Sequence, residues 1–124
     1  MLAEKLSGSA AAAVTYVDDV FSTYLYTGNG STQTINNGID LAGKGGLVWY
    51  KGRSVATDNE LVDTARGGDY YIQSNSTSAQ GMLASNEKLS FLSNGFSIGG
   101  ANYNGNRSGY TYASWTCLLY TSPS

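Results

Sequence analysis

The sequence predicts an all-β protein built as an antiparallel β-sandwich, and three observations carry this prediction. The 124 residues include 16 glycines and ten tyrosines but one proline, which is typical of short aromatic strands joined by turns with positive φ angles. Segments of strand character recur with turn signals about every 8–12 residues. A chain of this length makes one domain that buries roughly two-thirds of its surface on folding.

The first expected strand covers residues 19–26, which alternate β-branched and aromatic side chains and place Phe21 and Leu25 on one face. Asn29-Gly30 follows, the strongest short hairpin signal in the chain. Residues 32–36 are therefore expected to return as the partner of the first strand.

The later strands are weaker or shorter. Residues 47–51 are almost continuously apolar, which predicts a strand buried on both faces. Residues 60–66 fit either a strand or one helical turn. Trp49 and Trp115 lie within strand patterns, so both rings are predicted to be core. The other expected strands are residues 69–74, 88–92, 96–98 and 110–115, with a hairpin turn at Ser93-Asn94-Gly95.

The sandwich domain is expected to span residues 16–116. Residues 1–15 contain small residues and the acidic Glu4, so they are predicted to be a flexible or short helical lead-in rather than a signal peptide. Residues 117–124 are expected to be a tail that is not native to the domain. No apolar run approaches the roughly 20 residues that span a bilayer, so membrane insertion is not expected.

The composition excludes several kinds of chemistry. The chain has no histidine and a single cysteine, Cys117, which excludes a Ser-His-Asp triad, an internal disulfide and a thiolate zinc site. The net charge of −2 with 13% charged residues gives no basic patch for nucleic acid. We therefore expect a non-enzymatic protein without a metal or other cofactor.

Two weaker ideas involve carboxylates. Glu60 and Asp63 lie three residues apart, but in a strand they would face opposite ways, which disfavours a glycosidase pair. Asp58, Asn59 and Glu60 could offer oxygen ligands to calcium, but they match no calcium motif and are expected to form a solvated loop. A structural ion-pair group is expected instead, formed by Lys51, Arg53, Asp63 and Arg66.

A polar loop at residues 102–109 is the best candidate for a binding site. It holds one exposed aromatic ring together with amides and a guanidinium, from Tyr103, Asn104, Asn106 and Arg107. Sugars stack on aromatic rings while amides bind their hydroxyls. This loop is therefore the most plausible carbohydrate-binding patch in the sequence.

A set of short motifs in a fixed order completes the sequence evidence. They are Tyr16-Val-Asp-Asp-Val-Phe-Ser-Thr-Tyr-Leu-Tyr-Thr-Gly-Asn-Gly-Ser-Thr-Gln-Thr-Ile35, Asn37-Gly-Ile-Asp-Leu41, Gly46-Leu-Val-Trp49, Asp63-Thr-Ala-Arg-Gly67, Ser74-Asn-Ser-Thr-Ser-Ala-Gln80, Ser93-Asn-Gly-Phe-Ser-Ile-Gly99 and Tyr112-Ala-Ser-Trp-Thr116. Together they resemble a concanavalin A-like domain of unknown function found in marine bacteriophage tail-fibre-like proteins. The match is loose between Gly67 and Phe91, and after Thr116 the family pattern is lost.

This resemblance implies a concanavalin A-like jelly roll, truncated in this chain, from the tail of a phage virion. It implies a structural or host-attachment domain that contacts other virion proteins, further domains of the same chain or a host-surface glycan. It brings no catalytic residues. The alternative is a carbohydrate-binding module of a secreted bacterial protein, which would be extracellular.

Overall fold

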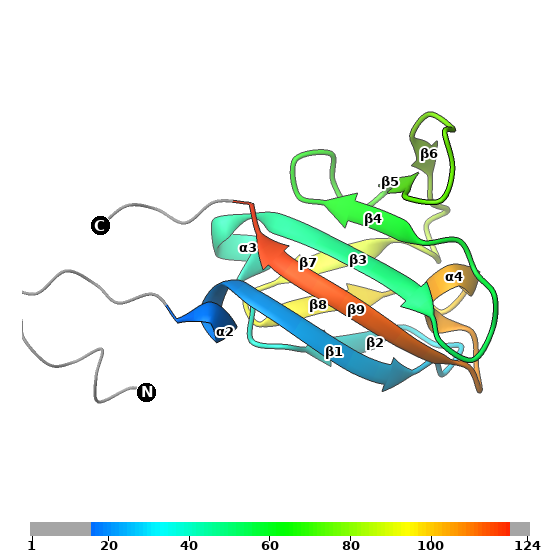
Figure 1. Ribbon diagram of the computed structural model, residues 1–124, viewed down its shortest axis with the longest axis horizontal. Coiled ribbons are helices and arrows are strands. Elements are labelled where there is room, and N and C mark those ends of the chain that lie inside the picture. The colour runs from blue at the N-terminus through cyan, green and yellow to red at the C-terminus, as the bar shows by residue number, and fades with distance from the viewer. Residues whose placement is uncertain (1–15, 120–124) are drawn as a thin grey trace, which may run out of the picture.

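The computed structural model describes residues 16–119 and shows two antiparallel sheets packed face to face (Figure 1). The larger sheet has six strands in the order β1-β9-β3-β4-β5-β6 and the smaller has three in the order β2-β8-β7. The predicted all-β antiparallel sandwich is therefore confirmed. The strands of the described chain are β1 Phe21–Thr27, β2 Gln33–Asn36, β3 Gly46–Gly52, β4 Glu60–Asp63, β5 Tyr70–Gln73, β6 Gly81–Met82, β7 Leu89–Leu92, β8 Gly95–Ile98 and β9 Thr111–Leu118.

In the described part of the chain, three single helical turns accompany the strands. They are α2 Val17–Val20 before β1, α3 Leu41–Lys44 before β3 and α4 Tyr103–Asn106 before β9. The Asp40 side chain caps α3 by accepting a hydrogen bond from the Gly43 N–H at 2.8 Å. Within the described residues, no helix is long and apolar enough to cross a membrane.

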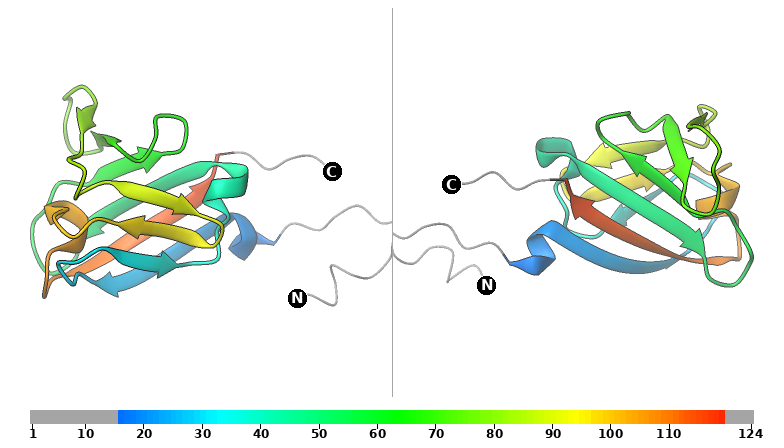
Figure 2. Two further views of the ribbon diagram at one scale, coloured as in Figure 1. Left: turned by 180° about the vertical axis from the view of Figure 1, so that it is seen from behind. Right: turned by 45° about the horizontal axis from the view of Figure 1, so that its top comes forward.

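The core lies between the sheets because alternate residues of each strand point inward. In β3, Val48 and Tyr50 are fully buried while Leu47, Trp49 and Lys51 are only partly buried. The smaller sheet, which lies in front in the left view of Figure 2, contributes its own apolar side chains to the core. These are Ile35, Leu89, Phe96 and Ile98.

The sequence correctly predicted the second hairpin. β7 and β8 pair around a tight turn, with Leu92 opposite Gly95 and Phe91 opposite Phe96. Residues 60–66 resolve into the strand β4 followed by a turn, and residues 69–74 contain β5. β9 continues through Cys117 and Leu118, which pair with β1 and β3. The lead-in at residues 1–15 and the last residues of the predicted tail, 120–124, lie outside the described residues.

The predicted hairpin between residues 19–26 and 32–36 is wrong. β1 pairs with β9 in the larger sheet, whereas β2 pairs with β8 in the smaller one. Gly30 does adopt a left-handed conformation, with φ of +70°, but the turn carries the chain from one layer to the other. The first strand also begins late, because Asp19 and Val20 belong to α2.

The prediction that Trp49 and Trp115 are core residues is also wrong. They are directly opposite each other on β3 and β9, on the outer face of the larger sheet. Their ring centroids are 5.2 Å apart with the planes tilted by 44°, and both side chains are partly buried. β3 is therefore fully buried on one face alone. Residues 47–51 suggested a strand buried on both faces because the partly buried outer face also carries apolar side chains.

The chain enters and leaves the sandwich at one end, and two connecting segments lie together at the other. The first and last described residues lie at one end, beside α2 and the end of β9 (Figures 1 and 2). The connection between β3 and β4 and the segment around α4 lie at the other end. We call this second region, residues 53–59 and 103–110, the loop end.

Candidate functional site

The loop end is held together by backbone contacts between segments far apart in sequence. The Arg53 N–H donates to the Thr111 carbonyl at 2.7 Å, and the Thr111 N–H donates to Ser54 Oγ at 2.9 Å. The Gly28 N–H donates to the Tyr110 carbonyl at 2.8 Å. A Cβ at Gly28 would collide with the Arg107 carbonyl, so glycine is required for this close approach.

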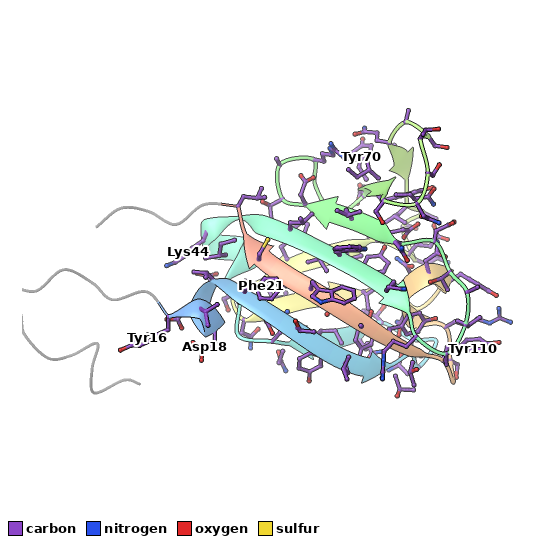
Figure 3. The ribbon with its side chains drawn as sticks, viewed as in Figure 1. Tyr16, Asp18, Phe21, Lys44, Tyr70 and Tyr110 are labelled. Atoms are coloured by element: carbon purple, nitrogen blue, oxygen red, sulfur yellow. The ribbon has the colours of Figure 1, made fainter. Side chains whose placement is uncertain are left out.

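Arg107 and two tyrosines form an aromatic and cationic cluster at the loop end. The Arg107 guanidinium carbon lies 4.3 Å from the centroid of the Tyr103 ring and 5.2 Å from that of Tyr110, within the range of cation–π attraction. Tyr103 is 49% exposed and Arg107 is also exposed. Figure 3 shows Tyr110 at this end of the molecule, away from Lys44. The aromatic contacts orient the guanidinium without using its N–H groups.

Asn106, also predicted to be in the patch, is fully buried. Its Oδ1 accepts hydrogen bonds from the Asn29 N–H and from Gln33 Nε2. Its Nδ2 lies within hydrogen-bonding distance of the carbonyls of Ser31, Ile98 and Gly99, at 2.8, 3.3 and 3.2 Å. Asn106 therefore ties the β1–β2 connection to the end of β8 and supports the patch from beneath, with its polar atoms already used.

Asn104, the fourth predicted residue, connects the patch to a buried carboxyl group. Its Nδ2 donates to Glu60 Oε2 at 2.9 Å, and the Tyr50 hydroxyl donates to Glu60 Oε1 at 2.6 Å. Asn102 Nδ2 in turn donates to the Tyr50 oxygen at 3.0 Å. Glu60 is only 2% exposed, so the expectation that residues 58–60 form a solvated loop is wrong at Glu60.

The burial of Glu60 makes its carboxyl group hold its proton more tightly. Desolvation raises the pKa of this carboxyl above its ordinary value of 4.5, and the hydrogen bonds from Tyr50 and Asn104 oppose that rise in part. Burial, together with the neighbouring Glu60 charge, also raises the pKa of the Tyr50 hydroxyl. Tyr50 therefore stays protonated and remains a donor to Glu60.

Glu60 and Asp63 do not face a common space. Because β4 is a strand, Glu60 points into the core while Asp63 lies on the outer face. Asp63 Oδ2 is 3.7 Å from Arg66 Nε, and its Oδ1 accepts a hydrogen bond from the Arg66 N–H at 2.8 Å. The Glu60 and Asp63 side chains therefore point to opposite faces of the sheet, as predicted for a strand. Across residues 16–119, no three of the histidine, cysteine, aspartate or glutamate side chains gather in a way that could hold a metal ion.

The predicted ion-pair group is only partly formed. Asp63 and Arg66 pair, but Lys51 and Arg53 line an open pocket of about 520 Å³ instead. The pocket is formed by one continuous segment at the β3–β4 connection, and its other lining residues are Gly52, Ser54, Val55, Ala56, Thr57 and Asn59. Sequence reasoning missed this pocket. It also missed that the pocket lies at the same end of the sandwich as Arg107, which follows from the pairing of β3 with β9.

The family comparison covers nearly the whole domain. A family described as a domain of unknown function (DUF7483) matches residues 17–122, and the chain belongs to that family. No curated protein and no solved structure matches the chain.

Proposed function

We propose that this chain is a non-catalytic host-attachment domain of a phage tail protein, with a concanavalin A-like sandwich that binds glycan through its loop end. The viral context is supported by the ordered motifs between Tyr16 and Thr116. Glycan binding is supported chiefly by one observation, the cluster of the exposed Tyr103 and Arg107 with the partly buried Tyr110. Aromatic rings for stacking and a guanidinium for hydroxyl or acidic groups suit sugars.

In this proposal the domain presents a binding surface and carries out no catalysis. A rigid sandwich holds its connecting segments in place, and such segments carry most binding contacts. Here Asn106 anchors the exposed segment from below, so the rings and the guanidinium need little ordering when a ligand binds.

A glycan array with the full 124-residue chain tests the proposal. We expect binding to at least one glycan class and a loss of at least tenfold in affinity for Tyr103→Ala and Arg107→Ala. Lys44→Ala removes an exposed cation at the opposite end and serves as the control. Absence of binding to every glycan would overturn the glycan-binding role and leave a purely structural domain.

Genomic neighbourhood tests the viral context separately. Adjacent tail, baseplate or capsid genes are expected. Adjacent genes for secreted polysaccharide-degrading enzymes would overturn the phage assignment in favour of a bacterial carbohydrate-binding module.

A further inference from the structure

Some lysine and arginine side chains of the described residues pair with a carboxylate and others do not. Arg66 pairs with Asp63, and Lys88 lies 3.9 Å from Asp69. Four other cations have no carboxylate partner within residues 16–119. Of these four, Lys44 lies at the opposite end, whereas Lys51, Arg53 and Arg107 belong to the loop end or border it. Three cations without counter-ions at one end of a protein of net charge −2 produce a local positive field.

Two carboxylates, Asp58 and Glu60, lie near these cations but outside the pocket lining. Asp58 Oδ2 accepts a hydrogen bond from Gln73 and its Oδ1 accepts one from Asn75. Glu60 is buried beneath Asn104, and burial favours its neutral form. Neither residue lines the pocket of Lys51 and Arg53. The positive charge of that pocket is therefore not neutralised from within its lining.

The pocket also offers hydroxyl groups as hydrogen-bond donors. Ser54 Oγ accepts from the Thr111 N–H and Thr57 Oγ1 accepts from the Gly52 N–H. Each hydroxyl keeps its own hydrogen for another acceptor. The lining thus combines two cations, two hydroxyls and the Asn59 amide, without a carboxylate.

Arg107 adds a preorganised anion-binding group at the same end. Its guanidinium rests on the rings of Tyr103 and Tyr110, which leaves the planar N–H edge free for a bidentate contact. Carboxylate and sulfate oxygens match that geometry. Stacking rings beside the guanidinium suit an acidic group carried on a sugar ring.

From this arrangement we infer that the loop end binds an acidic polysaccharide, one that carries carboxylate or sulfate-ester groups. Arg107 and the pocket cations Lys51 and Arg53 would contact the acidic groups, and Tyr103 would stack on a sugar ring. This inference rests on the proposed glycan-binding function and names the chemical class of the ligand.

The test is calorimetric titration of the full chain with three polymers. Dextran sulfate and dextran share one backbone and differ in sulfate, while polygalacturonate supplies carboxylates. We expect at least one acidic polymer to bind tenfold or more tightly than dextran, with affinity that falls as salt is raised because exposed charges are screened. Comparison of the two acidic polymers shows which acidic group is preferred.

Matched variants locate the site. Arg107→Gln and Arg53→Gln each remove one charge while keeping a polar side chain, and each is expected to weaken binding at least fivefold. Lys44→Gln removes one charge at the opposite end and should stay within twofold of the parent. All three positions are exposed, and equal unfolding midpoints would exclude loss of fold.

The outcomes separate the two proposals. Tighter binding to dextran or another neutral glycan than to either acidic polymer overturns the acidic-ligand inference and leaves glycan recognition standing. Equal losses in Lys44→Gln and Arg107→Gln also overturn it, because binding would then follow net charge. Absence of binding to all polymers and all arrayed glycans overturns both proposals.

Discussion

The two faces of the six-stranded sheet carry aromatic side chains from the same strands in very different settings. On the inner face, Tyr50 and Tyr112 are fully buried and their hydroxyls are hydrogen bonded. On the outer face, Trp49 and Trp115 are only partly buried, and the buried Trp49 Nε1 has no hydrogen-bond partner among residues 16–119. Adjacent aromatic residues of one strand, such as Trp49 and Tyr50, thus differ in burial and in whether their polar atoms are hydrogen bonded.

The difference shows that the inner tyrosines do more than fill the core. The Tyr112 hydroxyl accepts from the Arg107 N–H at 3.0 Å and donates to the Tyr103 carbonyl at 3.1 Å. The Tyr26 hydroxyl donates to the Gly105 carbonyl at 2.8 Å. Burial raises the pKa of both hydroxyls, so they stay protonated and able to donate. Core side chains therefore hold the backbone of the candidate site.

The largest expected effect is on the inner face. Tyr112→Ala should lower the free energy of unfolding by about 3–5 kcal/mol, because it leaves a large cavity and removes two hydrogen bonds to the loop end. Urea denaturation of the purified chain measures this. Tyr112→Phe keeps the ring and should cost only about 1 kcal/mol. A loss below 1 kcal/mol for Tyr112→Ala would contradict the difference between the faces.

Substitutions on the outer face should lower the free energy of unfolding by less. Trp115→Ala is expected to cost about 1–2 kcal/mol, since the ring is only partly buried. Leu25, on the same face and 56% exposed, is the control, and Leu25→Ala should cost less than about 0.5 kcal/mol. If Trp115→Ala proved as costly as Tyr112→Ala, the outer face would have to be covered in solution.

The smallest expected effect is a change in pH dependence at Glu60. Its raised pKa means that the folded state holds this proton more tightly than the unfolded state. Stability should therefore fall as pH rises from the ordinary value of 4.5 through the folded pKa, and the contribution is fully present below 4.5. Glu60→Gln should remove this part of the slope above pH 4.5.

The control for Glu60 is Asp63→Asn, which removes one negative charge from the outer face of the same strand. Urea denaturation at several pH values compares the two variants. If both variants changed the slope equally, the effect would come from net charge rather than from burial.

Sequence patterns predicted the class of the fold because alternation and turn residues are local properties. They located the β7–β8 hairpin for the same reason, since its two strands are joined by a tight turn. They failed for β1 and β2, because Asn29-Gly30 fixes a local bend but not the partner of each strand. Pairing with β9 and β8 is decided by contacts far away in sequence.

The candidate site was predicted in part for similar reasons. Tyr103 and Arg107 were identified because one polar loop holds both. Asn106 is in the same loop, yet its side chain is turned inward by five hydrogen-bonding groups from other segments. Alternation along β3 and β9 separates two faces but does not say which faces the core, so the tryptophans were placed on the wrong one.

The first and last described residues lie at the end of the sandwich opposite the loop end (Figures 1 and 2). A domain tethered through these residues would point its loop end away from the attachment point. Several copies anchored side by side would then face the same way and could engage one repeating polymer together. In such an array, weak single contacts would add up to strong attachment through high effective concentration.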